Sequence, residues 1–221
     1  MLREVSLEEI SDGRKYSLND MVKAGCDDCS GCSACCCAMG ESIVLDPCDM
    51  YRLTAGLGES PQQLLTKYLE LHVVDGIILP NMGMKGADEH CSFLNGEGRC
   101  SIHPYRPGIC RLFPLGRCYE GGAFRYFLQV HECRKENRTK VKVRKWIDTP
   151  DAGRYDCYIM DWHNFLKKLR ERNCEQTAKE ISMYVLQKFF LIGYQADAGF
   201  YEEFYVRLNE AECWADTLKI C

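Results

Sequence analysis

Residues 26–37 read CDDCSGCSACCC, which places six cysteines in twelve positions. Thiols this crowded oxidise easily, so disulfide bonds or a bound metal must hold them. A chain of 221 residues buries enough apolar surface to fold without covalent cross-links. We therefore interpret the sixteen cysteines of the chain as metal ligands or redox groups before we consider a disulfide framework.

The composition predicts a cytoplasmic protein. Its N-terminal stretch MLREVSLEEISDGRKYSLND lacks an apolar signal-peptide core, and no run of about 18 apolar residues occurs, so we expect no membrane partner. The cytoplasm keeps thiols reduced, which favours metal ligation. The formal net charge of −4 argues against nucleic acid as a partner. We interpret the basic run RKENRTKVKVRK (134–145) as a solvated surface face.

Cysteine density divides the chain into three segments. Residues 1–25 form an N-terminal segment, residues 26–139 a cysteine-cluster metal-binding domain, and residues 140–221 a helical region that we expect to pack on it. The cysteine-rich segment is punctuated by many Gly and Pro residues, which indicates loops. The sequence thus predicts an α+β fold, mainly helical, in which an irregular cysteine-rich half with short strands precedes a C-terminal helical bundle.

Local signals place several elements. Asp46 and Ser60 each precede a proline, so each is predicted to cap a helix, and the second helix is expected to extend to Leu71. HVVDGIILP (72–80) is typical of a hairpin with Asp75-Gly76 as its turn. Further patterns predict a strand at 124–130 and helices at about 140–147, 156–172, 175–194 and 199–219.

The first cysteine block suits two kinds of metal site. Cys26, Cys29, Cys32 and Cys36 have the spacing C-x2-C-x2-C-x3-C, by which bacterial ferredoxins bind iron–sulfur clusters, although Cys37 replaces the proline that follows there. The CxxC pairs within the block also match the knuckles of tetrahedral zinc sites. Spacing alone does not separate iron from zinc.

A second block, CSFLNGEGRCSIHPYRPGICRLFP (91–114), follows the first, and Cys133 comes after it. The two blocks contain, in order, CxxCxxCC, CxFL, CSI, RP and CR. This combination resembles the YkgJ-type cysteine-cluster family, named for its CxxCxxCC signature and described as a zinc- or iron-chelating domain. The resemblance covers about residues 26–133. It implies eight metal-ligating cysteines, which are Cys29, Cys32, Cys35, Cys36, Cys91, Cys100, Cys110 and Cys133. The ferredoxin-like spacing would add Cys26 as a ninth ligand.

Two arginines in the second block are candidates for contact with a bound cofactor. Thiolate sites carry excess negative charge, so guanidinium groups at Arg106 and Arg111 would lower repulsion and tune a cluster's potential. The alternative for Arg106 is a helix cap or a carboxylate pair. His103 stands where the family usually has Tyr, and we interpret it as an aromatic replacement before a ligand.

Three functions follow. The first is a metal-binding protein that holds an iron–sulfur cluster, such as 4Fe-4S, in preference to zinc, with a redox, metal-handling or sensing role. The second, which the resemblance implies, is an S-adenosylmethionine-dependent protein lysine N-methylase similar to flagellin lysine methylases, although the chain lacks a Gly-rich nucleotide loop. The third is a structural zinc-binding interaction module. Whether the chain is an enzyme stays open, and no catalytic residue is assigned.

Overall fold

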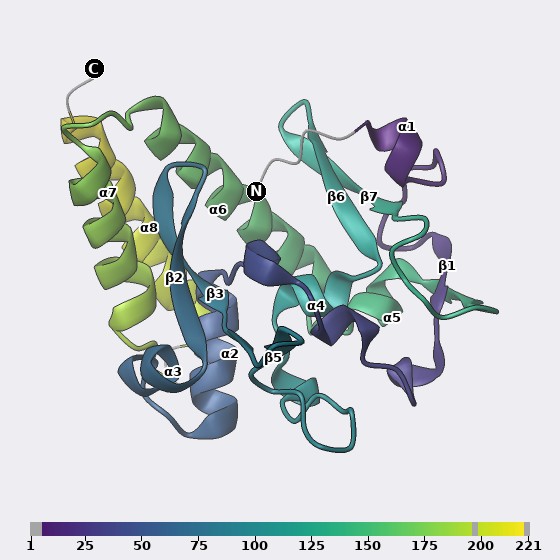
Figure 1. Cartoon of the computed structure of the whole chain (residues 1–221). Coiled ribbons are helices and arrows are strands. Elements are labelled where there is room, and N and C mark those ends of the chain that lie inside the picture. The colour runs from purple at the N-terminus through teal and green to yellow at the C-terminus, as the bar shows by residue number, and fades with distance from the viewer. Residues whose placement is uncertain (1–5, 196–198, 219–221) are drawn as a thin grey trace.

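The computed structural model of the chain describes residues 6–195 and 199–218, with the side chain of Asp28 excepted (Figure 1). Its α-helices are α1 (Leu7–Ile10), α2 (Pro47–Leu57), α3 (Pro61–Lys67), α4 (Gly108–Leu112), α5 (Val143–Ile147), α6 (Ala152–Glu171), α7 (Ala178–Val185) and α8 (Phe200–Thr217). Its strands are β1 (Met21–Gly25), β2 (Leu69–Val74), β3 (Ile77–Met82), β4 (Met84–Lys85), β5 (His90–Cys91), β6 (Leu115–Glu120), β7 (Ala123–Leu128) and β8 (Thr139–Lys142). Short 3-10 turns are η1 (Asp27–Cys29), η2 (Ala34–Cys36), η3 (Gly40–Ser42) and η4 (His103–Tyr105), and α7 continues into the π-helical turn η5 (Leu186–Leu191).

The strands form small antiparallel sheets of two strands each. The pairs are β1 with β8, β2 with β3, β4 with β5, and β6 with β7. Figure 1 shows the long helices α6, α7 and α8 gathered on one side, with β1, β6, β7 and α5 on the other. The fold is therefore α+β and mainly helical, with a cysteine-rich half of loops and short strands before the helical part, as predicted.

Two helix starts follow from capping boxes. The Asp46 carboxylate accepts a hydrogen bond from the backbone N–H of Asp49, whose own carboxylate accepts one from Asp46 N–H. Ser60 caps α3 in the same manner, so both predicted caps are confirmed. The expected extension of the second helix to Leu71 is wrong. That residue belongs to β2, because residues 69–74 pair along their whole length with β3.

The predicted hairpin at residues 72–80 is confirmed, whereas the first part of the helix predicted at 140–147 is a strand. Asp75 and Gly76 have φ angles of 48° and 86°, as a tight two-residue hairpin turn requires. The predicted helix at 140–147 is a helix only from Val143, because residues 139–142 pair with β1 instead. The partner strand lies more than a hundred residues away, and local periodicity carries no signal of it.

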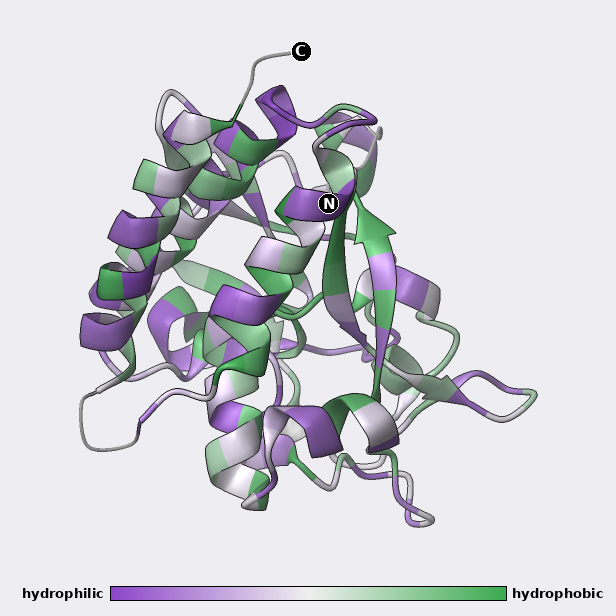
Figure 2. Ribbon diagram, turned by 90° about the vertical axis from the view of Figure 1, so that its left-hand side faces the viewer, coloured by the Kyte–Doolittle hydropathy of each residue, from purple (hydrophilic) through white to green (hydrophobic). Residues whose placement is uncertain are grey.

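Two hydrophobic cores hold the elements together. The larger core joins α2 and the β2–β3 hairpin to α6, α7 and α8, and includes Leu53, Phe165 and Phe204. The smaller core fills the space between β1, β6, β7, α4 and α5, and includes Val22 and Tyr126. Figure 2 shows hydrophilic and hydrophobic residues on the long helices, as amphipathic packing requires. No helix within the described residues has the length and apolar character needed to span a membrane.

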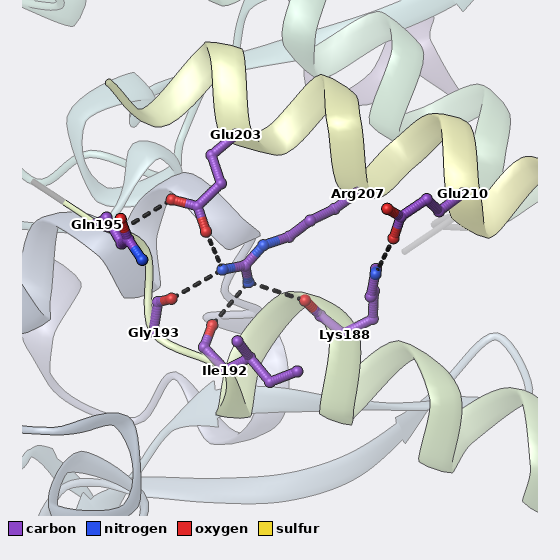
Figure 3. Close-up of polar contacts among 7 residues, drawn as sticks. All are labelled: Lys188, Ile192, Gly193, Gln195, Glu203, Arg207 and Glu210. Atoms are coloured by element: carbon purple, nitrogen blue, oxygen red, sulfur yellow. Dashed lines mark hydrogen bonds and ion pairs between the residues drawn. The ribbon is translucent and has the colours of Figure 1, made fainter. Parts of the chain in front are cut away.

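A buried arginine fixes the end of η5 against α8 (Figure 3). Arg207, only 6 % exposed, donates hydrogen bonds to the carbonyls of Lys188, Ile192 and Gly193 at 2.6–2.9 Å and pairs with Glu203. Its guanidinium therefore satisfies carbonyls that a helix C-terminus leaves without partners. The charge at Arg207 also complements the negative end of the helix dipole.

Candidate metal centre

The first group of thiols lines a small cavity. Group A consists of Cys26, Cys29, Cys32 and Cys133, and Cys35 also reaches this cavity. The Sγ atoms of Cys26 and Cys29 lie 3.4 Å apart. The cavity volume is about 20 Å³, which is room for one water molecule or one ion. Group A therefore brings Cys133, the last cysteine of the family pattern, next to the first cysteine block.

Left-handed backbone turns shape the loop that carries these thiols. Asp27, Cys29 and Ala38 have φ angles of 51°, 57° and 55°. Non-glycine residues pay about 1–2 kcal/mol each for this conformation. These residues lie within the first cysteine block or directly after it, and Cys26, Cys29, Cys32 and Cys35 of this block line one cavity. Strain that persists at such a site indicates a functional constraint on it.

The second group collects thiols from separate stretches of the chain. Group B consists of Cys36, Cys91, Cys100 and Cys110, which interact electrostatically with one another. Cys35 lies between the groups, because its charge raises the pKa of Cys29 in group A and of Cys36, Cys91, Cys100 and Cys110 in group B. Cys35 also lines the group A cavity and precedes Cys36 directly in the chain, so the two groups adjoin at this point.

Backbone hydrogen bonds explain why these stretches meet. Cys37 forms an isolated β-bridge with His90, which places the CxxCxxCC block beside the strand that carries Cys91. A second bridge joins Leu94 to Cys100 and closes the loop between the two cysteines of the second block. The last group B thiol, Cys110, is carried by α4.

The protonation of these thiols follows from burial and from one another. The Cys36 thiol donates a hydrogen bond to Cys35, which lowers the pKa of Cys35 to about 6 and raises the pKa of Cys36. Burial raises the pKa of Cys91, Cys100 and Cys110. Without metal, most of the group B thiols therefore hold their protons. A metal would replace those protons, because it binds the thiolate form.

Arg106 lies beside both groups. Its positive charge lowers the pKa of Cys29 in group A, of Cys100 in group B, and of Cys35 between them. Arg106 Nη1 lies 2.6 Å from His103 Nε2, and since a guanidinium has only donors, the imidazole nitrogen accepts. His103 thus holds in place the guanidinium whose charge acts on the thiols.

Arg111 occupies a different environment. It is 2 % exposed, donates from Nη1 to Thr149 Oγ1 at 2.9 Å, and lies over the ring of Tyr155 at 5.5 Å. Its charge lowers the pKa of the buried Asp49. Arg111 therefore compensates buried carboxylate charge, whereas Arg106 faces the thiols.

Sequence reasoning missed the role of Asp49. Its Oδ1 accepts a hydrogen bond of 2.6 Å from Gly108 N–H, at the start of the helix that carries Cys110. A Cβ atom at position 108 would lie 2.2 Å from the Tyr155 hydroxyl, so only glycine fits there. The cap at Asp46 was predicted from the sequence, but the contact between α2 and α4 left no local signal. Asp49 thus links α2 to the helix of a group B thiol.

We expect Asp49 to make stability depend on pH. Burial, followed by the charge of Asp46, raises the pKa of Asp49 to about 7 from 3.8. Between these values the folded protein keeps a proton that the unfolded chain has lost, so the free energy of unfolding falls as pH rises through this window. The slope from this group is at most about 1.4 kcal/mol per pH unit. The other charged groups around Asp49 are Arg111 and Arg52, and the backbone N–H of Gly108 donates a hydrogen bond to its carboxylate.

Urea unfolding of wild type and Asp49→Asn at about pH 5 and about pH 8 measures this contribution. We expect the loss of stability between the two pH values to be larger in wild type than in the variant. Equal losses would show that Asp49 does not titrate in this range.

The described residues supply candidate metal ligands, but these are not arranged around one common centre. No three His, Cys, Asp or Glu side chains among residues 6–195 and 199–218 already form a group that would hold one metal ion. The donors that do gather are thiols, which suit zinc, copper(I) and iron–sulfur clusters. The chemistry of this donor set therefore fits a thiolate-bound metal.

Comparison with known proteins agrees with this chemistry. Residues 28–150, more than half of the chain, match the family model CxxCxxCC, described as "Putative zinc- or iron-chelating domain". A search of curated proteins and a search of solved structures each found no significant match. The matched segment contains every thiol of groups A and B except Cys26. The chain therefore belongs to the CxxCxxCC family of zinc- or iron-chelating domains.

Proposed function

We propose that groups A and B bind metal and that the protein carries an iron–sulfur cluster with a redox role. The observation that supports this proposal is the number of thiols that gather: group A and Cys35 line one cavity, and Cys36 of group B follows Cys35 directly in the chain. The charge of Cys35 also raises the pKa of Cys29, Cys36, Cys91, Cys100 and Cys110. A single tetrahedral ion takes four ligands, so this set exceeds one mononuclear site.

The charges around the thiols favour a cluster. When bound, a cluster supplies one-electron transfer. The chain would contribute thiolates that hold it, burial around Cys110 that limits water, and the Arg106 guanidinium, which lowers repulsion between thiolates. Hydrogen bonds and positive charge near cluster sulfurs raise the reduction potential. Arg106 is accordingly proposed as a tuning residue.

A structural zinc site is the second candidate, and group A favours it. Bond lengths of about 2.3 Å place the sulfurs of a tetrahedral zinc site about 3.8 Å apart. The 3.4 Å between the Cys26 and Cys29 sulfurs is close to this value. A cavity of about 20 Å³ also suits a single ion. Zinc at group A would stabilise the loop without carrying electrons.

The methylase alternative remains a prediction from resemblance. Equilibrium dialysis with labelled S-adenosylmethionine tests it directly, and saturable binding near one molecule per chain would support it. The described residues around groups A and B provide thiols and guanidinium groups, but nothing in their arrangement favours this ligand over a metal.

The experiment that tests the cluster proposal is visible and electron paramagnetic resonance spectroscopy of protein purified without oxygen. We expect a brown protein whose broad visible absorption bleaches on reduction, together with a paramagnetic signal in one of the two states. A colourless protein that contains zinc after anaerobic purification would favour the structural candidate instead.

A further inference from the structure

The basic run of the sequence stays outside the ion pairs of the described residues. Its seven cations are Arg134, Lys135, Arg138, Lys140, Lys142, Arg144 and Lys145. With Glu136 as the one carboxylate, residues 134–145 carry +6 in a chain of net charge −4. Elsewhere cations pair between distant segments, as Lys15 does with Glu120 and Arg154 with Glu202. Among the described residues, no ion pair of this kind neutralises the charge of the run.

Part of this run forms a regular surface with β1. Met21 pairs with Lys142 in the β1–β8 sheet, and side chains on a strand alternate between faces. Val22 is 1 % exposed and faces the core, so Met21 and Lys23 face solvent. Lys140 and Lys142 on β8 are exposed as well. We call Lys23 together with residues 134–145 the basic ribbon, and Met21, 49 % exposed, is an apolar contact within it.

The basic ribbon begins at the wall of the group A cavity. Arg134 and Lys135 line this cavity together with Cys133. Lys135 Nζ also donates a hydrogen bond of 2.6 Å to the carbonyl of Ser30, in the loop between two group A cysteines. A molecule bound on the basic ribbon would therefore lie beside the thiols.

We propose that the basic ribbon docks the acidic face of a partner protein that exchanges electrons or metal with the thiol groups. What is exchanged rests on the proposed function, whereas the docking does not. Complementary charge steers association and fixes orientation. An acidic face oriented by lysines at β1 and β8 would be placed close to the group A cavity.

The same surface suits nucleic acid less well. Trp146, the aromatic residue nearest to the run, donates from Nε1 to the carbonyls of Leu112 and Phe113 at 3.2 Å, so its indole is committed to the fold. Base stacking on aromatic side chains usually accompanies binding of single strands. The net negative charge of the remaining surface would also repel a long polyanion.

Charge reversal tests the docking. The variant Lys140→Glu/Lys142→Glu reverses two exposed charges on the ribbon, and Lys167→Glu/Lys179→Glu makes the same net change on exposed positions of α6 and α7. The probes are a short oligoglutamate peptide and a DNA duplex of equal charge, titrated at about 50 and 200 mM salt. Circular dichroism and metal content are measured on every protein.

We expect the peptide to bind wild type at low salt. Its affinity should fall at least about tenfold in the ribbon variant and also at high salt, whereas the affinity of the control variant should stay within about twofold of wild type. Equal loss in both variants, or no binding by wild type, would overturn the proposal. Tighter binding of DNA than of peptide, lost in the ribbon variant, would replace it with a nucleic-acid surface. If a zinc-containing protein binds the peptide, the docking proposal is supported and the cluster proposal is contradicted. If a protein that carries a cluster binds no peptide, the docking proposal is contradicted and the cluster proposal is supported.

Discussion

Replacement of Cys35 and Cys36 by serine is expected to remove most of the bound metal. Cys35 is the thiol whose charge reaches both groups, and Cys36 belongs to group B. Serine is a poor ligand for metals that prefer soft thiolates. Because structural metal sites contribute about 10 kcal/mol or more of folding free energy, the variant should also unfold at a markedly lower temperature. Metal per chain, measured after anaerobic purification, is expected to fall to about a tenth or less of the wild-type value.

The matched control is Cys157→Ser/Cys213→Ser. These two thiols are exposed on α6 and α8, and neither lines the group A cavity. We expect wild-type metal content and unfolding temperature in the control. If the Cys35/Cys36 variant does not fold, the single variant Cys100→Ser removes one group B thiol instead. Full metal content in a folded Cys35/Cys36 or Cys100 variant would contradict the proposed ligands.

Replacement of Arg207 by leucine is expected to lower the free energy of unfolding by about 3–5 kcal/mol, the usual cost of removing one partner from a buried charge pair. The variant leaves Glu203 uncompensated and deprives the η5 carbonyls of their donor. The cation also lies 3.9 Å from the centre of the Tyr194 ring, an interaction that leucine does not replace.

Lys188→Ala is the control, since Lys188 pairs with Glu210 across the same two helices but near the surface. Exposed pairs contribute at most about 1 kcal/mol. Urea unfolding of both variants, followed by circular dichroism, compares them. An Arg207→Leu loss no larger than the Lys188→Ala loss would show that the buried network contributes little.

Local chemistry made part of this fold predictable. The caps at Asp46 and Ser60 and the Asp75-Gly76 turn depend on neighbouring residues, and each was correctly placed. Residues 140–142 were assigned to a helix because the partner of their strand, β1, lies far away in the chain. Hydrophobic periodicity depends only on residues that are near one another in the sequence, so it does not predict pairing with a distant strand.

The same limit applies to the metal centre. The spacing and the family resemblance pointed to a set of cysteines, but their division into groups A and B depends on contacts such as the bridge from Cys37 to His90. The two arginines illustrate this further. The charge of Arg106 acts on the thiols, whereas Arg111 lies beside the buried Asp49 and Tyr155, and this difference could not be predicted from the positions of the two arginines in the sequence.

The measurement that tests the central claim most directly is the amount of iron, zinc and acid-labile sulfide per chain in wild-type protein purified without oxygen. The proposed function predicts iron with a matching amount of sulfide, and both lost together in the Cys35/Cys36 variant. Zinc without sulfide would contradict the cluster while leaving thiolate ligation intact. Protein free of all three, yet folded, would contradict metal binding by groups A and B altogether.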